Sequence, residues 1–210
     1  MSNTPAEYIV WIDCEMTGLD VAVHGLTEVA VIITDFALSP VDPGISLVIN
    51  PGSEALAQMD DFVKNMHEES GLLPQIKNGL SLNQAEEKLI EYLGRFIPAG
   101  EKPLVAGNTI GMDRRFISRY LPAFDDLLHY RSIDVSTIKE LARRWYEPAF
   151  WAAPAKQGGH RALADIAESI QELAYFRDTV MVASPGPEQA EAQRVSERIA
   201  EAYAPFVQAG

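Results

Sequence analysis

Residues 8–15 read Tyr-Ile-Val-Trp-Ile-Asp-Cys-Glu, a run of five apolar or aromatic residues followed by a polar cluster. Such a run is typical of a buried β-strand, and the cluster marks the point where the strand leaves the core. Because side chains two residues apart on a strand point the same way, Asp13 and Glu15 can reach one location while Cys14 faces the core. The stretch therefore predicts a core strand with two carboxylates at its C-terminal end.

Outward from this strand, two more strands are expected over residues 28–34 and 44–50, and the short connections favour an antiparallel meander. Helices then alternate with short strands, which is typical of an α/β fold whose mixed central β-sheet is flanked by helices. Functional sites in such folds lie at strand ends and in the loops that follow them. The remaining elements are expected as a helix opened by a capping box at Ser81 and Gln84 and continuing through Phe96, strands over 104–106 and 133–135, a helix beginning near Asp113, a helix capped by Ser136 and continuing through Trp145, an irregular loop over 146–159, and helices over 162–182 and 188–203.

The composition is that of an ordinary folded protein. The chain has 210 residues, 47% of them hydrophobic, which suits one domain or one domain with an appendage. Its single cysteine, Cys14, cannot form an internal disulfide, which fits a reducing compartment. No apolar run approaches the ~20 residues of a membrane span, and residues 1–5 lack the basic and apolar regions of a signal peptide. We expect a cytoplasmic protein that does not enter a membrane.

The formal net charge of −13 restricts the kind of nucleic acid that the protein could bind. A broad surface for long nucleic acid needs clustered Lys and Arg, because each phosphate contact neutralises a negative charge. A small pocket in which metal ions supply the positive charge remains compatible with an acidic protein.

Three further residues could join the two strand acids. Asp113 precedes apolar residues at helical spacing, so it heads the inward-facing stripe of a helix, although an N-cap carboxylate is the alternative. His160 follows Gly158 and Gly159 and lies five residues before Asp165, which places it on a loop or first turn and Asp165 inside a helix. Taken singly, the acids could be solvated and the histidine a surface residue, so the case depends on their meeting at one place.

Four acids and a histidine suit the hydrolysis of a phosphodiester. The reaction needs an activated water and stabilisation of the charge that develops on the leaving oxygen. Two divalent metal ions about 3.5–4 Å apart do both, and hard cations such as Mg²⁺ or Mn²⁺ prefer oxygen ligands. A histidine with a pKa near neutrality can accept the proton of the water.

The order Asp13-x-Glu15, then a segment from Asn108 to Asp113, then His160-x₄-Asp165 resembles the signature of the DEDDh exonucleases. Within that superfamily the chain is similar to the oligoribonucleases, and the resemblance covers residues 7 to 182. The matching segments are Trp-Ile-Asp-Cys-Glu-Met-Thr-Gly-Leu over 11–19, Gly-Asn-Thr-Ile-Gly-Met-Asp-Arg-Arg-Phe over 107–116, His-Tyr-Arg over 129–131, Asp-Val-Ser-Thr over 134–137, Lys-Glu-Leu-Ala-Arg-Arg-Trp over 139–145 and Glu-Leu-Ala-Tyr over 172–175.

The resemblance implies an RNase H-like exonuclease fold, a homodimer, and removal of nucleoside 5′-monophosphates from the 3′ end of very short single-stranded RNAs, dinucleotides above all. It implies an exonuclease domain over 1–183 and leaves a C-terminal helical extension over 184–210. The implied metal ligands are Asp13, Glu15, Asp113 and Asp165, with His160 as general base. The implied substrate contacts are Leu19 between the two bases, Phe62 stacked on a base, Thr109, Arg131 and Ser136 on the 5′ phosphate, and Tyr130 from the partner subunit.

The chain departs from the family pattern at three places. Phe62 stands where the family usually has tryptophan, which predicts weaker base stacking. Thr109 replaces the common serine and keeps the hydroxyl. The extension from 188 to 203 passes the usual end of the domain. For Arg131 the alternative is a structural ion pair, and for the whole protein the alternatives are an exonuclease for longer DNA or RNA and a non-catalytic binding module.

Overall fold

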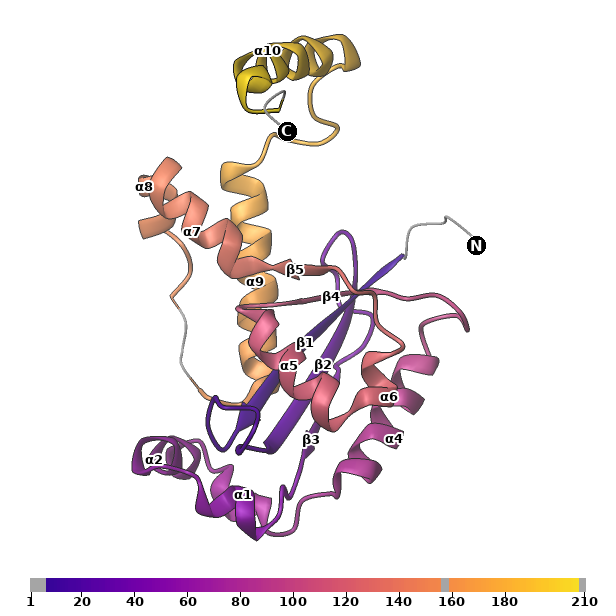
Figure 1. Ribbon diagram of the computed structural model, residues 1–210, viewed down its shortest axis with the longest axis vertical. Helices are drawn as coiled ribbons and strands as arrows, with labels where there is room; N and C mark the ends of the chain where they lie inside the picture. The colour runs from indigo at the N-terminus through magenta and orange to yellow at the C-terminus, as the bar shows by residue number, and fades with distance from the viewer. Residues whose placement is uncertain (1–6, 156–158, 208–210) are drawn as a thin grey trace.

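The computed structural model describes residues 7–155 and 159–207 and centres on a five-stranded sheet in the order β3-β2-β1-β4-β5 (Figure 1). β1 (Tyr8–Met16) pairs antiparallel with β2 (Leu26–Asp35), which pairs antiparallel with β3 (Ile45–Val48). On its other side β1 pairs in parallel with β4 (Leu104–Gly107), and β4 with β5 (Ser132–Asp134). The expected meander and the mixed sheet are both confirmed.

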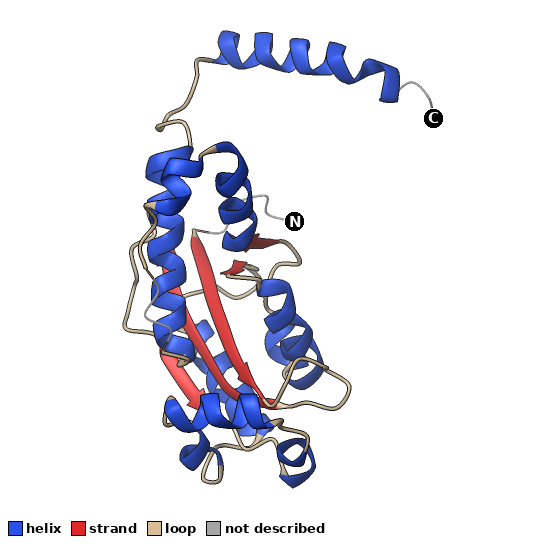
Figure 2. Cartoon of the chain, turned by 90° about the vertical axis from the view of Figure 1, so that its left-hand side faces the viewer, coloured by secondary structure: helices blue, strands red, loops and turns tan. Residues whose placement is uncertain are grey.

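Ten helices complete the described part of the chain, and Figure 2 shows helices on both sides of the sheet, with the C-terminal helix apart from it. They are α1 (Ser53–Ala57), α2 (Asp61–Glu69), α3 (Leu73–Ile76), α4 (Leu82–Gly94), α5 (Ile110–Tyr120), α6 (Pro122–Asp125), α7 (Val135–Trp145), α8 (Glu147–Trp151), α9 (Ala162–Val180) and α10 (Gln189–Val207). α4 opens with the capping box expected at Ser81, whose hydroxyl accepts from Gln84 N at 3.3 Å.

The alternation of side chains along β1 divides the core in two. Val10, Ile12 and Cys14 belong to one apolar cluster, which α4, α5 and α6 complete. Ile9 and Trp11 belong to the other, which α7 and α9 complete on the opposite face. Asp13 and Glu15 continue the second series, so β1 delivers both acids to the face that α9 covers.

Several expected boundaries were wrong. The helix expected from near Asp113 begins at Ile110, one turn earlier, because Thr109 takes a left-handed conformation and ends the preceding loop. Ser136 is not the cap of α7, since the Asp134 side chain accepts from Ser136 N at 2.9 Å. The loop expected over 146–159 contains α8, and the strand expected over 44–50 is shortened to Ile45–Val48.

The C-terminal helix α10 covers the helix expected over 188–203 and lies apart from the sheet and its flanking helices (Figure 2). Its apolar side chains remain largely exposed, as at Tyr203 and Phe206. Among residues 7–155 and 159–207, no helix is both long and apolar enough to cross a membrane.

Candidate active site

Three carboxylates meet where β1 approaches α9. Asp13 and Glu15 come from the C-terminal half of β1, and Asp165 comes from the first turn of α9. Each residue offers one carboxylate oxygen, and these three oxygens all lie within 4.8 Å of one another. α9 packs its apolar stripe, with Ile166 and Ile170, on this face of the sheet, and that packing brings Asp165 to the strand. The two segments are 150 residues apart in sequence, so the fold creates the cluster.

The cluster is electrostatically unfavourable when no cation is bound. Glu15 is only 8% exposed, and burial raises its pKa from 4.5 to about 8, with the carboxylates of Asp165, Glu28 and Asp113 adding to the shift. Arg161 opposes the shift in pKa but does not cancel it. A group of acids that cannot all ionise on their own is the arrangement that a cation relieves.

Asp113 approaches the same strand from α5. Its Oδ1 accepts a hydrogen bond from the backbone N of Cys14 at 3.0 Å, between the two strand acids. Burial raises the pKa of Asp113 to about 7, against the two backbone N–H groups that lower it. Asp113 therefore faces inward, as its helical spacing predicted, and the N-cap position of α5 belongs to Thr109 instead. It lies outside the group formed by the other three carboxylates.

His160 lies just before α9, exposed to solvent, with a left-handed φ of 46°. Gly159 precedes it, and Gly158, on which the prediction of a loop also depended, lies outside the described residues. The next residue, Arg161, forms a bidentate ion pair with the buried Glu28, with Nε–Oε2 at 3.1 Å and Nη2–Oε1 at 3.0 Å. Glu28 is the β2 partner of Glu15, so this pair holds the histidine segment beside the carboxylates.

Sequence reasoning missed Glu28, Arg161 and also His67. His67 is fully buried on α2, with Nε2 at 2.9 Å from the Met16 carbonyl oxygen and Nδ1 at 3.8 Å from Glu15 Oε2. Since a carbonyl only accepts, Nε2 donates. Burial lowers the pKa of His67, which favours the neutral ring. The hydrogen bond to Met16 joins α2 to the end of β1. The sequence offered no signal for this contact, because its partner is a backbone atom 51 residues away.

The residues expected at the 5′ phosphate fall into two groups. Thr109 and Ser136 are in contact, with their hydroxyl oxygens 3.1 Å apart. The Thr109 N–H donates to Ser136 Oγ and to Asp134 Oδ1, both at 3.0 Å. These bonds stabilise a left-handed φ of 54°, which a β-branched residue rarely adopts.

Tyr130 and Arg131 form the second group, in the segment that enters β5. The Tyr130 ring stacks on His129 with centroids 4.5 Å apart, and the Arg131 guanidinium lies over the Tyr130 ring at 5.3 Å. Arg131 N donates to His129 Nδ1 at 3.0 Å, and Arg114 Nη1 donates to the His129 carbonyl at 2.6 Å. Tyr130 is 74% exposed.

Leu19 and Phe62, expected beside the bases, are both exposed at the carboxylate end of the sheet. Leu19 is 67% exposed in the loop between β1 and β2, and Phe62 is 77% exposed in the first turn of α2. The Leu19 loop is fastened to α5, because Tyr120 Oη donates to the His24 carbonyl at 2.6 Å. Both apolar side chains thus lie on elements adjoining the end of β1 that carries Asp13 and Glu15.

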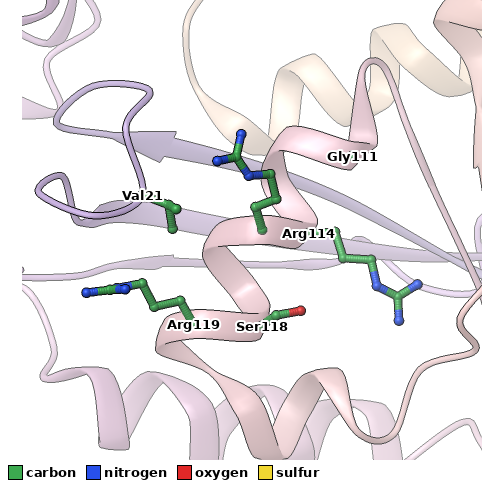
Figure 3. A pocket seen from close by; sticks show the side chains of 6 residues that line it. Val21, Gly111, Arg114, Ser118 and Arg119 are labelled. Atoms are coloured by element: carbon green, nitrogen blue, oxygen red, sulfur yellow. The ribbon is translucent and has the colours of Figure 1, made fainter.

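A cavity of about 570 Å³ lies on the outer face of α5 and is a different place from the carboxylate cluster. Figure 3 shows Arg114, Ser118 and Arg119 lining it together with Val21 and the start of the helix at Gly111. Arg115, which also lines it, is two residues from Asp113, and two residues turn a helix by about 200°. The Arg115 side chain thus points away from the buried carboxylate.

Comparison with known proteins identifies the family to which the chain is similar. The family model described as Exonuclease (RNase_T) matches residues 10–173. The chain is 54% identical to the oligoribonuclease of Leifsonia xyli over 95% of this chain and 97% of the relative. It is 52% identical to the oligoribonuclease of Cutibacterium acnes, over 86% and 89% of the two chains, and 45% identical to that of Streptomyces griseus, over 94% and 98%.

Solved structures give the fold. Exonuclease I of Methylocaldum szegediense superposes with a TM-score of 0.58 at 20% identity, and E. coli exonuclease I in complex with a dT13 oligonucleotide with 0.62 at 15%. Each match covers 82% of this chain and 41% of the exonuclease I chain, so the present chain spans well under half of those proteins. The fold is the RNase H-like exonuclease fold.

Proposed function

The chain belongs to the exonuclease family described as RNase_T and, within it, to the oligoribonucleases, and from this premise we propose that it is a 3′-to-5′ exoribonuclease that degrades very short RNAs, dinucleotides above all, to nucleoside 5′-monophosphates. The observation that carries the proposal is the meeting of Asp13, Glu15 and Asp165 within 4.8 Å of one another at the end of β1.

The donor set fits divalent metal ions. All of the candidate ligands, Asp13, Glu15, Asp113 and Asp165, offer carboxylate oxygens, which Mg²⁺ and Mn²⁺ prefer. The raised pKa values of Glu15 and Asp113 fit this assignment, because a bound cation favours the ionised carboxylates against the burial and the neighbouring negative charges that raise those pKa values. When bound, two such ions would supply activation of the attacking water and stabilisation of charge on the leaving oxygen.

His160 is the proposed general base. Its place on an exposed segment, with Arg161 paired to Glu28, leaves the imidazole free to approach from solvent toward the carboxylates. A histidine in that position can accept the proton of the attacking water and pass it to bulk solvent.

The remaining residues are proposed to bind the two nucleotides. Leu19 would lie between the bases and Phe62 would stack on one of them. Thr109, Arg131 and Ser136 would hold the 5′ phosphate, with a bidentate guanidinium contact from Arg131. A pocket that ends at this phosphate needs no long basic groove, which agrees with the net charge of −13.

We further propose a cytoplasmic homodimer in which Tyr130 reaches into the site of the partner subunit. Its exposed ring is available for such a contact. Residues 1–183 would form the exonuclease domain and residues 184–210, with α10, an extension that does not contribute to the site.

The test is cleavage of 5′-phosphorylated RNAs of two, four, seven and twenty nucleotides, with Mg²⁺, with Mn²⁺ or with chelator. We expect a steep preference for the dinucleotide that chelator abolishes. Metal-dependent cleavage at equal rates per 3′ end would leave an exonuclease without a length limit, and would overturn the assignments at the 5′ phosphate. Failure to cut any length with metal present would favour a non-catalytic binding module.

A further inference from the structure

A chain of hydrogen bonds runs from α7 through the buried Glu172 on α9 to the two hydroxyls expected at the 5′ phosphate. Glu172 on α9 is 4% exposed, and its Oε1 lies 2.9 Å from Lys139 Nζ on α7. Its Oε2 accepts from Asn108 Nδ2 at 3.0 Å. Asn108 Oδ1 in turn accepts from Ser136 Oγ at 3.0 Å, and Ser136 Oγ accepts from Thr109 N.

The direction of every bond in this chain follows from Glu172. An ionised carboxylate can only accept, so Asn108 must present its NH₂ group to Glu172 and its carbonyl oxygen to Ser136. Ser169 imposes the same orientation, because its hydroxyl donates to the Asp165 carbonyl at 2.8 Å and so accepts from Asn108 Nδ2 at 2.8 Å. The amide of Asn108 is therefore oriented by two independent acceptors.

The orientation of the Asn108 amide also determines which atoms accept the protons of the two hydroxyls. Ser136 has one proton, and the Asn108 carbonyl oxygen receives it. The Ser136 oxygen meanwhile accepts from Thr109 N, and its remaining lone pair faces Thr109 Oγ1 at 3.1 Å. Between the two hydroxyls, Thr109 must then be the donor. Only the Thr109 proton can turn from this weak partner to a phosphate oxygen.

We propose that Glu172 is a positioning residue for the 5′-phosphate end of the site: through Asn108 it commits the Ser136 proton, so that Thr109, and not Ser136, donates a hydroxyl hydrogen bond to the phosphate. The inference rests on the proposed function, in that a 5′ phosphate must bind beside Thr109. The part of Ser136 in holding the 5′ phosphate is then indirect: its oxygen keeps Thr109 in the left-handed conformation that aims the threonine hydroxyl.

The first experiment compares the two hydroxyls. The readout is the ratio of kcat/KM between a 5′-phosphorylated dinucleotide and the same dinucleotide with a 5′ hydroxyl. Thr109→Val, which keeps the branched shape, should lower this ratio about tenfold, the usual worth of a hydrogen bond to a charged group. Thr109→Ser should retain the ratio, and Ser136→Ala should lower it by less than Thr109→Val does. A larger effect of Ser136→Ala would overturn the assignment of the donor.

The second experiment tests Glu172 itself. In Glu172→Gln the side chain keeps one acceptor oxygen where the carboxylate has two, one facing Lys139 and one facing Asn108. The charged Lys139 should take that oxygen, leaving an NH₂ group against that of Asn108. The ratio should fall, again by about tenfold. In the double variant Lys139→Met with Glu172→Gln the oxygen is free to face Asn108, and the ratio should recover. A merely structural role would lower turnover of both substrates together and leave the ratio where it was.

Glu140→Gln is the matched control, since Glu140 pairs with Arg144 on the exposed side of α7, the helix that carries Lys139. The ratio in this variant should stay at the wild-type value. If Glu172→Gln does not fold, the double variant still decides: a folded double variant with a low ratio would overturn the proposal. Wild-type enzyme that shows no preference for the 5′-phosphorylated dinucleotide would instead overturn the proposed phosphate site, whatever the variants do.

Discussion

At the scale of single residues, the ionisation of Glu15 and Asp113 connects metal binding to stability. Both carboxyls have raised pKa values, about 8 and about 7, against ordinary values of 4.5 and 3.8. Between these limits the folded, metal-free protein holds protons that the unfolded chain releases. Stability is therefore greatest near the ordinary values and falls as pH rises toward the raised ones.

The resulting prediction concerns thermal stability. With chelator, Tm should fall between about pH 5 and pH 8, and Glu15→Gln, which cannot ionise, should lose part of that slope. With Mn²⁺, the increase in Tm should grow over the same range, because the metal binds the ionised carboxylates. Scanning calorimetry at four pH values checks both. Identical slopes in the wild type and in Glu15→Gln would contradict the raised pKa of Glu15.

The exposed segment of His160 leads to a second prediction. His160→Ala should slow dinucleotide cleavage by ~10²–10⁴, the usual contribution of a positioned base. It should keep the Mn²⁺-induced increase in Tm, because the carboxylates are unchanged. Steady-state kinetics and the Tm shift measured on the same preparation separate the two effects. Near-normal turnover in this variant would remove His160 from the mechanism.

At the scale of elements, α2 is the part of the site that the sequence showed least. It carries Phe62 in its first turn and His67 in its last, and the His67 bond to the Met16 carbonyl fixes the helix against β1. The aromatic ring is thus held on an element that is joined directly to the metal side of the site.

Base stacking on α2 can be tested at Phe62. Phe62→Ala should raise KM for a dinucleotide about tenfold with little change in kcat, since base stacking contributes ~1–3 kcal/mol. Phe62→Trp should lower KM below the wild-type value, because the larger ring covers more of the base. Equal KM values in all three proteins would mean that α2 does not stack on the substrate.

The elements also explain what could be predicted from sequence. The apolar run over residues 8–12 predicted β1, and the two-residue repeat of a strand predicted the shared face of Asp13 and Glu15. Helical spacing predicted the inward side of Asp113. Helices α1 and α3, of five and four residues, are too short to carry a periodic signal. The contacts Arg161–Glu28 and His67–Met16 join distant segments, and composition or spacing within one segment contains no information about them.

At the scale of the whole molecule, the proposed exchange of Tyr130 between subunits can be tested with mixed dimers. Asp165→Asn should be inactive and Tyr130→Ala weakened on dinucleotides. A dimer with one copy of each has one site with intact carboxylates and a partner tyrosine, so it should recover about half of the wild-type activity. Differently tagged subunits allow its purification. Activity no higher than that of the Tyr130→Ala protein would place Tyr130 in its own subunit's site.

The buried position of Cys14 makes its rate of chemical modification a measure of how often β1 opens. Cys14 lies between two of the proposed metal ligands, its side chain is 7% exposed in the core, and burial raises its thiol pKa well above the ordinary value. A thiol reagent can therefore modify it only in moments when the strand separates from its neighbours. The rate of modification in native buffer therefore reports how often the strand opens. Divalent metal that bridges β1 to α9 should lower this rate by making the openings rarer, while the reactivity of the reagent stays the same.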